Sequence, residues 1–236
     1  MRILVTRPQP SAAATAARLQ AMGHEVAVLP VMEASHQPQA ALAALARPHS
    51  AIAVTSAEAI RALMPYRVEL APHLQTPVYC VGPATAEATR KIGFQSIVTG
   101  TGTGEALAKI ITAASANLED GLVYFAGWPR SPAFEAGLKA AGIACDTAET
   151  YRMAAIAHPA ETVETLLSPH LPDTVLLYSH ETARHFFALL SPVMARALSG
   201  ARLICLSDHV ADAVPAGFGP VSVAAEPSED ALLALL

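Results

Sequence analysis

Hydroxyl side chains stand at four points where an apolar run typical of a strand gives way to a helical pattern. They are Ser56, Thr85, Ser179 and Ser207. The first backbone N–H groups of a helix have no partner within it, and the helix dipole favours negative charge there. In an open α/β sheet, ligands bind at this edge. The turns therefore predict a site for an anionic small molecule; the alternative for each hydroxyl is a simple helix N-cap, worth about 1 kcal/mol.

Two arginines and a tyrosine are further candidates. Arg7 follows Thr6 at the end of the first predicted strand, and Arg130 follows the matching strand later in the chain. A guanidinium can hold a carboxylate through two parallel hydrogen bonds. We therefore expect Thr6, Arg7 and Arg130 at the ligand edge, with a solvated arginine in a turn as the alternative. Tyr151 lies in an extended segment, where its hydroxyl can face the ligand or its ring can simply pack.

Residue spacing excludes several other kinds of chemistry. The glycines of 100–104 do not match a dinucleotide-binding loop, and the histidines at 180 and 185 are too far apart to share a helix face as in a zinc protease. There is no Walker A sequence and no Gly-x-Ser-x-Gly elbow. The 9 histidines and 3 cysteines form no ligand pattern. We expect neither a metal nor a cofactor.

Composition excludes further classes of protein. The net charge is −5 and the lysines are only Lys91, Lys109 and Lys139, whereas a nucleic-acid-binding protein would show a basic stripe. Apolar residues make up 53% of the chain, enough to build a core. No apolar run reaches the roughly 18 residues of a membrane span, and the N-terminus does not read as a signal peptide. We expect a cytoplasmic protein that binds neither nucleic acid nor membrane.

The chain repeats one pattern twice. The repeated segments are 51–63 with 176–189, 78–94 with 202–218 and, more weakly, 4–23 with 123–142. The separation is 119 residues from Gly23 to Gly142 and 123 residues from Ser56 to Ser179. This nearly constant offset indicates two copies of one α/β unit. Two similar domains facing each other would form a cleft in which a ligand can bind.

Short β-branched runs alternate with alanine-rich helical stretches along the chain. Strands are predicted at 2–6, 25–29, 51–55, 78–81, 96–98, 121–125, 143–147, 174–178, 202–206 and 221–224. Helices are predicted at 10–22, 38–46, 57–64, 84–92, 104–115, 131–141, 160–167, 180–190, 208–215 and 228–236. Strict alternation implies α/β architecture, with parallel sheets and helices on both faces. Ten strands divide into two five-stranded sheets of flavodoxin-like size.

Two segments interrupt the alternation and bear on how the chain is divided. Residues 30–38 and 149–159 each follow the second strand of a repeat and end at a proline, which favours an extended conformation. The chain either crosses between domains at both segments or divides in sequence near residue 118. The crossing topology has these parts: 1–30 plus 158–236 as one domain, 38–150 as the other, and linkers at 31–37 and 151–157. The residue pattern alone leaves both topologies open.

Several short motifs, taken in order, resemble the uroporphyrinogen-III synthase family. They are VTRP at the first strand, TSAEAI after the third, VGPATAEA after the fourth, ETYR in the second extended segment and YSHETARHF at the later serine turn. Each motif is short. The ordered set spans nearly the whole chain and carries the resemblance.

The resemblance implies two flavodoxin-like domains, one formed by the middle of the chain and one by its two ends, which selects the crossing topology. It implies a monomeric hydro-lyase without cofactor or metal. The substrate would be hydroxymethylbilane, a linear tetrapyrrole with eight carboxylates, which the enzyme closes to uroporphyrinogen III with inversion of ring D. Loss of hydroxide would give an azafulvene cation, and ring D would attack through its substituted carbon to give a spiro intermediate.

By motif position, the resemblance assigns Tyr151 to departure of the hydroxyl group. It places Ser56, Thr85 and Ser179 at the edge of the cleft as polar contacts to the substrate.

The chain departs from the family in its last repeat. Leu206-Ser207-Asp208-His209 stands where many members have a Gly-x-Thr-Thr turn. Asp208 would repel a substrate carboxylate unless it caps the helix and faces away, so Ser207 alone is kept as a binding candidate from this turn. A rival interpretation of the whole chain is a non-catalytic two-domain protein that binds a small anionic ligand and has no need of Tyr151.

Overall fold

The computed structural model describes residues 1–168 and 170–236. Pro169, inside the segment 158–236 that was predicted to complete the first domain, lies outside the described residues. The chain divides into two compact units, one made of Met1–Glu33 with Ala154–Leu236 and the other of Ala34–Met153. None of the described helices has the length and apolar character that a bilayer crossing requires.

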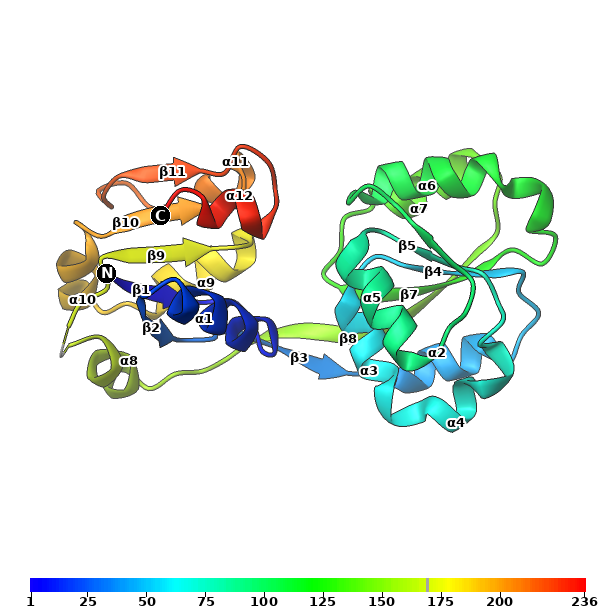
Figure 1. Ribbon diagram of the computed structural model, residues 1–236, viewed down its shortest axis with the longest axis horizontal. Coiled ribbons are helices and arrows are strands. Elements are labelled where there is room, and N and C mark those ends of the chain that lie inside the picture. The colour runs from blue at the N-terminus through cyan, green and yellow to red at the C-terminus, as the bar shows by residue number, and fades with distance from the viewer. Residues whose placement is uncertain (169) are drawn as a thin grey trace. The chain divides into compact units, whose positions relative to one another are not determined.

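The first unit contains a five-stranded sheet in the order β11-β10-β9-β1-β2, and all of its neighbouring strands are parallel (Figure 1). Its strands are β1 (Arg2–Val5), β2 (Glu25–Val28), β9 (Thr174–Leu177), β10 (Arg202–Cys205) and β11 (Val221–Val223). Its helices are α1 (Ser11–Ala21), α8 (Ala160–Leu167), α9 (His180–Leu189), α10 (Pro192–Leu198), α11 (Asp208–Ala211) and α12 (Glu229–Leu233).

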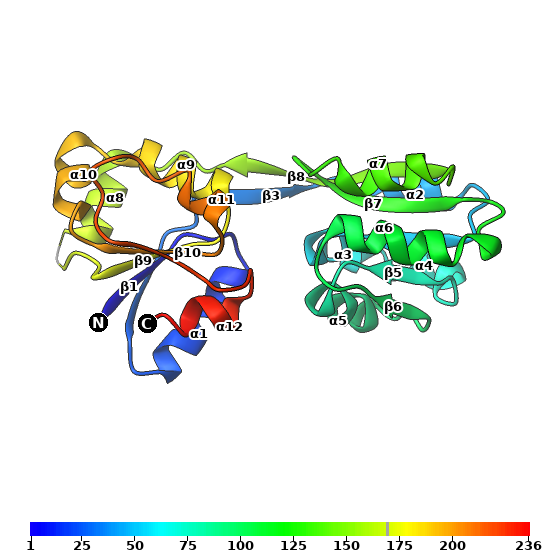
Figure 2. The same cartoon turned by 90° about the horizontal axis from the view of Figure 1, so that it is seen from above.

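Helices cover both faces of this sheet. Figure 2 shows α1 and α12 on one side of the strands and α8, α9, α10 and α11 on the other. On the α1 side, apolar residues of β1, such as Ile3 and Val5, pack with Leu19 of α1 and Leu232 of α12. Because both faces are covered, the three central strands are apolar after their first residues, which are Arg2, Thr174 and Arg202, as is typical of parallel sheets.

The second unit contains a six-stranded sheet in the order β3-β8-β7-β4-β5-β6. Its last five strands in this order, from β8 across to β6, are all parallel to their neighbours. Its strands are β3 (Met32–His36), β4 (Ala51–Val54), β5 (Val78–Cys80), β6 (Ile97–Thr99), β7 (Leu122–Trp128) and β8 (Cys145–Ala155). Its α-helices are α2 (Pro38–Leu45), α3 (Ala57–Leu63), α4 (Arg67–Leu70), α5 (Pro83–Ile92), α6 (Gly104–Ala113) and α7 (Ala133–Ala140). Short 3₁₀ turns occur at Met64–Tyr66, Ala71–His73 and Ser115–Asn117.

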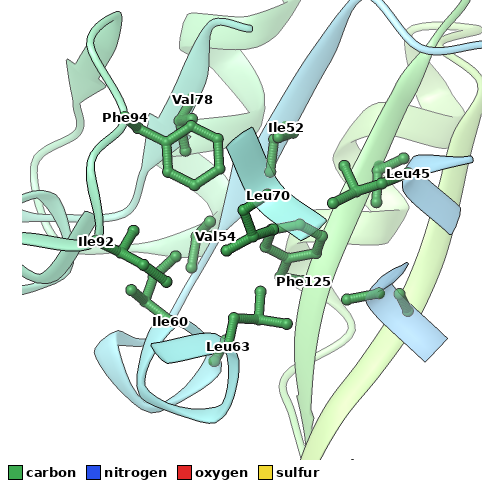
Figure 3. Packing of buried hydrophobic residues seen from close by; sticks show 14 of the residues in the cluster. Leu45, Ile52, Val54, Ile60, Leu63, Leu70, Val78, Ile92, Phe94 and Phe125 are labelled. Atoms are coloured by element: carbon green, nitrogen blue, oxygen red, sulfur yellow. The ribbon is translucent and has the colours of Figure 1, made fainter. Parts of the chain in front are cut away.

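A separate core covers each face of this second sheet. On the face covered by α2, α3, α4 and α5, Phe125 of β7 lies among aliphatic side chains that include Leu63 and Leu70 (Figure 3). We call this the α3-side core. On the other face, Tyr124 of β7 packs with α6 and α7, and its ring meets that of Phe134 edge to face with centroids 4.7 Å apart. We call this the α7-side core.

Each sheet combines strands from both sequence repeats. The first repeat supplies β1 and β2 to one sheet but β4, β5 and β6 to the other; the second repeat supplies β7 and β8 to that other sheet and β9, β10 and β11 to the first. The first strand of each repeat therefore has the same kind of neighbour. β1 of the first repeat pairs with β9 of the second, and β7 of the second repeat pairs with β4 of the first. The two repeats have exchanged their last three strands.

The prediction of five strands in each sheet is wrong for the second unit. Its sixth strand, β3, comes from the segment predicted as a linker at 31–37, and β8 continues to Ala155 through part of the linker predicted at 151–157. Both segments are extended, but they also pair: Ile156 N donates to Val31 O at 3.0 Å and Gln37 N to Thr150 O at 2.6 Å. Residue numbers rise along one strand as they fall along the other, so the pair is antiparallel.

Two predicted C-terminal helices are shorter than expected, and two further helices were not predicted. The helices expected at 208–215 and 228–236 end at Ala211 and Leu233. The helices α4 and α10 fall in stretches rich in proline, arginine and methionine, where the apolar period was too short to recognise.

The short helix α4 allows a test of the α3-side core with an internal control. Leu70 is fully buried, whereas Val68 of the same helix is 85% exposed. We expect Leu70→Ala to lower the free energy of unfolding by about 2–5 kcal/mol, because it leaves a cavity. Val68→Ala should change it by less than about 0.5 kcal/mol. Urea unfolding of both variants measures the difference, and equal effects would contradict the placement of α4.

Candidate functional site

Ser56 begins α3 at the carboxyl end of β4. Its backbone is extended, with φ −153° and ψ 136°, and its hydroxyl accepts a hydrogen bond from Glu58 N at 3.1 Å. The side chain is thus a helix N-cap, which satisfies one of the amides that lack a partner in the first turn. The Ala57 amide lies between them at the same turn and belongs to the same set of unpaired donors.

Tyr151 of β8 lies close to the Ser56 turn. Its ring packs against the α3-side core and is partly buried. Burial raises the pKa of the Tyr151 phenol, and the nearby Ser56 side chain opposes that rise only in part. The phenol is therefore protonated at neutral pH and can act as a proton donor. Of the predicted residues in this unit, Ser56 and Tyr151 are brought together.

Three ionisable side chains beside this pair, Glu58, Arg61 and His36, were missed from the sequence. Glu58 accepts one hydrogen bond from Arg61 Nε at 2.6 Å and lies 2.7 Å from His36 Nε2. Glu58 and Arg61 also act on the Tyr151 phenol electrostatically, in opposite directions. The three-residue spacing of Glu58 and Arg61 was a readable signal for a helix-surface pair, but nothing in the sequence placed His36 beside them.

Thr85 and Arg130 occupy different surroundings from Tyr151. Thr85 is only 4% exposed within α5, and its carbonyl accepts from the hydroxyl of Thr89 at 2.8 Å. Arg130 is held by two carboxylates, with Nε 2.9 Å from Glu135 and one terminal nitrogen 3.0 Å from Glu149. These hydrogen bonds raise the pKa of Arg130 and lower that of Glu135. Its guanidinium is therefore largely committed to internal partners.

Ser179 and Ser207 begin helices at the ends of the adjacent strands β9 and β10 in the first unit. Ser179 is extended and accepts from Thr182 N at 3.2 Å, which makes it the N-cap of α9. Ser207 is also extended, but its hydroxyl makes no capping hydrogen bond to α11. Ser207 therefore has a hydroxyl that is not committed to the helix it precedes.

A histidine pair joins these two turns. The rings of His180 and His209 are stacked, with centroids 4.7 Å apart and planes within 9° of each other. His180 Nδ1 also lies 3.5 Å from Glu181. This pairing was missed because the two histidines are remote in sequence, and only the parallel pairing of β9 with β10 brings their turns side by side.

Thr6 and Arg7 are tied into the first unit by internal hydrogen bonds. Thr6 is fully buried and its hydroxyl donates to Leu176 O at 3.1 Å. Arg7 lies over the ring of Tyr178, 4.1 Å from its centroid, and donates to Glu229 at 2.8 Å. The ion pair and the cation–π contact fix this guanidinium beside the Ser179 turn.

Glu229 of α12 is the centre of that network. It also accepts hydrogen bonds from Thr15 at 2.5 Å and from the Tyr178 phenol at 3.1 Å, and it pairs with Arg18 at 3.0 Å. Burial by itself raises the pKa of Glu229, but the Thr15 hydrogen bond and the charge of Arg7 outweigh it and lower the pKa. Burial raises the pKa of Tyr178 to about 12. The network fastens the C-terminal helix to α1, β1 and β9.

The described residues contain no group of three or more His, Cys, Asp or Glu arranged to hold a metal ion. The fold and the turns define an α/β protein with parallel sheets whose polar side chains gather where strands end and helices begin.

Two crystal structures share this fold. Uroporphyrinogen-III synthetase from Helicobacter pylori is 16% identical with a TM-score of 0.68, covering 100% of this chain and 98% of that one. A mutant uroporphyrinogen III synthase from Thermus thermophilus is 18% identical with a TM-score of 0.58, covering 100% and 96%.

The family model of uroporphyrinogen-III synthase HemD matches residues 13–234 of this chain. A search of curated proteins found no match. The chain therefore belongs to the uroporphyrinogen-III synthase family. The reaction of this family is the cyclisation of hydroxymethylbilane to uroporphyrinogen III in tetrapyrrole biosynthesis.

The Glu229 network generates a prediction about pH. Because the folded-state pKa of Glu229 is lowered, its stabilising contribution is present above the unfolded value of 4.5 and is lost as pH falls through the folded value. At pH near 7, Glu229→Gln should lower the free energy of unfolding by about 1.5–3 kcal/mol, the range for hydrogen bonds to a charged group. The difference from the unsubstituted protein should shrink as the pH is lowered below 4.5.

Urea unfolding at a series of pH values measures this effect. Glu105→Gln is the matched control, because Glu105 is also paired with a cation, Lys109 at 2.7 Å, but its side chain is 67% exposed. Its effect on stability should be much smaller at every pH. A pH-independent loss for Glu229→Gln would show that packing, rather than charge, holds α12.

Proposed function

We propose that this chain carries out the family's ring closure with Tyr151 as the proton donor to the departing hydroxyl group. The observation that carries the proposal is the position of the Tyr151 phenol, protonated and partly buried beside the Ser56 turn. A positioned acid speeds departure of a poor leaving group such as hydroxide. The resulting azafulvene cation is then attacked by ring D through its substituted carbon, giving the spiro intermediate that fragments and recloses.

We propose further that the two units are flavodoxin-like domains with the limits 1–30 plus 158–236 and 38–150. The strand order β2-β1-β9-β10-β11 is the flavodoxin-like order 2-1-3-4-5. The order β8-β7-β4-β5-β6 is also 2-1-3-4-5 when β7 and β8 are counted as strands 1 and 2 and β4, β5 and β6 as strands 3, 4 and 5. This numbering reflects the exchange of strands between the repeats. The monomeric state and the cytoplasmic location expected from the sequence stay predictions.

The substrate carries many carboxylates, and we propose that backbone amides hold most of them. The three lysines are on helices, and Lys109 is already paired with Glu105. Arg7 and Arg130 each have an internal carboxylate partner within 3.0 Å. Amides at the starts of helices supply donors that need no cationic side chain. Ser56, Ser179 and Ser207 stand at such turns, and Thr6 and Arg7 lie beside the Ser179 turn. Thr85 and Arg130 stand at two other strand-to-helix turns, after β5 and β7.

Holding one geometry is the main task for this reaction. Hydroxymethylbilane can also close without an enzyme, to the isomer in which ring D is not inverted. Catalysis therefore depends on positioning and on stabilising developing charge, more than on a strong nucleophile. The rival function, a non-catalytic protein that binds a small anion, would have no use for a protonated phenol at the Ser56 turn.

Replacement of Tyr151 tests the proposed acid. Tyr151→Phe removes the hydroxyl but keeps the ring in the α3-side core, so thermal stability should barely change. We expect kcat to fall about ten-fold or somewhat more, because positioned acids contribute 10²–10⁴-fold and water can partly replace the phenol. Steady-state assays with hydroxymethylbilane measure this, and an unchanged kcat would leave Tyr151 with a packing role only.

A second pair of substitutions separates amides from hydroxyls. Ser56→Ala should weaken substrate binding by only about 1 kcal/mol or less, near the net value of a neutral hydrogen bond. Ala57→Pro removes one amide at the first position of α3, where proline is accepted, and the extended backbone of Ser56 suits a following proline. We expect the proline variant to fold normally and to bind substrate more weakly than the alanine variant.

The corresponding variants of the other unit are Ser179→Ala and His180→Pro. The proline there also removes the ring that stacks on His209, so the Ser56 turn gives the cleaner comparison. KM and circular dichroism spectra should be recorded for all four proteins. A thousand-fold loss of activity in the alanine variants, with little loss in the proline variants, would show that side chains hold the substrate.

A further inference from the structure

The side chains of β8 change faces between Glu149 and Tyr151. Thr147 donates to Glu135 of α7 at 2.9 Å and Glu149 accepts from Arg130, so both lie on the α7 side. Successive side chains of a regular strand point to opposite faces, which would place Tyr151 on the α7 side as well. Tyr151 instead packs in the α3-side core, the cluster that also contains Ala148.

A β-bulge causes the change. Ala126 of β7 is paired with Glu149, but the next residue, Gly127, is paired with Tyr151, so Thr150 is an extra residue with no partner in β7. A bulge of this kind bends the strand and re-aims the following side chain. Without it, the phenol of Tyr151 would point away from Ser56.

Thr150 is held on both sides. Its side chain is fully buried, and its hydroxyl donates to Ala126 O at 3.0 Å. Its own carbonyl accepts from Gln37 N at 2.6 Å, just beyond β3. The Thr150 hydroxyl therefore fastens the bulge to β7, and the Gln37 amide satisfies the Thr150 carbonyl from the β3 side.

Gly127 provides the space into which Tyr151 is turned. A Cβ atom at this position would lie 2.2 Å from Cζ of Tyr151 and 2.4 Å from its hydroxyl oxygen. Carbon atoms cannot approach so closely, so any other residue at 127 would displace the ring. Glycine inside a strand often marks a bulge or a close approach of this kind.

We propose that Thr150 and Gly127 are positioning residues for Tyr151. Thr150 maintains the bulge that turns the phenol toward the Ser56 turn, and Gly127 leaves the space that the ring occupies beside β7. The consequence for catalysis rests on the proposed role of Tyr151, whereas the consequence for the position of its ring does not.

The experiment uses the full-length chain carrying Thr150→Val or Gly127→Ala. Thr89→Val is the control for the first, because Thr89 is equally buried and also donates its hydroxyl to a backbone carbonyl, that of Thr85 at 2.8 Å. Gly137→Ala is the control for the second, because a Cβ there would lie 2.7 Å from that of Ala108 but nowhere near Tyr151. Each protein is labelled at tyrosine Cζ with ¹³C, and the Tyr151 resonance is assigned by its loss in Tyr151→Phe.

Two measurements are made on each variant: the chemical shift and pH titration of the Tyr151 resonance, and kcat and KM with hydroxymethylbilane. We expect Thr150→Val and Gly127→Ala to shift the resonance, to bring its titration closer to that of an exposed tyrosine and to lower kcat about ten-fold, with KM changed by less than about two-fold. The controls should lose thermal stability to a similar extent but keep the resonance and kcat. Adding Thr150→Val to Tyr151→Phe should cause no further loss of kcat.

An unchanged Tyr151 resonance and titration in both variants would overturn the positioning role. A further ten-fold loss of kcat when Thr150→Val is added to Tyr151→Phe would also overturn it, because Thr150 would then act on something else. If Tyr151→Phe alone keeps full activity, the proposed acid is wrong. The resonance then still decides whether Thr150 and Gly127 set the ring.

Discussion

The pairing of β7 with β8 is the constraint on which the rest of the second unit depends. It is regular from Leu122 to Ala126 and then slips by one residue at the bulge. Before the slip, β8 presents Glu149 to Arg130; after it, β8 presents Tyr151 to the Ser56 turn. The same strand pairs with β3 on its other side. The bulge between β7 and β8 thus divides β8 into two parts. The part before it presents Glu149 on the α7 side of the sheet, and the part after it presents Tyr151, the proposed acid, on the α3 side.

The distribution of the charged side chains supports the proposal that backbone amides bind most of the substrate's carboxylates. Arg7 and Arg130 lie at matching turns of the two repeats. Arg7 is paired with one glutamate of its own unit and Arg130 with two. These pairs stiffen the turns, because either arginine would have to give up its ion pairs to swing out. The helix starts beside them then present amides in fixed directions, which is the preorganisation that a positioning enzyme needs.

Much of the fold could be predicted from the sequence, because period and turn residues are local properties. The ten strands and the serine turns after β4 and β9 were readable in this way. The sixth strand was not, since β3 is a polar stretch whose pairing depends on β8 far along the chain. The partners of Arg7 and Arg130, the stacked histidines 180 and 209, and the bulge at Thr150 were also beyond reach, because each depends on contacts between segments remote in sequence. The hydroxyl of Tyr151 could be named, but its direction could not.

The most direct test of the central claim is the product made from freshly prepared hydroxymethylbilane. The protein is incubated with this substrate, the porphyrinogen is oxidised and the porphyrin isomers are separated. The account predicts that the type III isomer predominates, because ring closure with inversion of ring D requires the substrate to be held in one geometry. A product that is only the type I isomer, formed at the rate seen without protein, would contradict it and would favour a protein that binds an anion without catalysing ring closure.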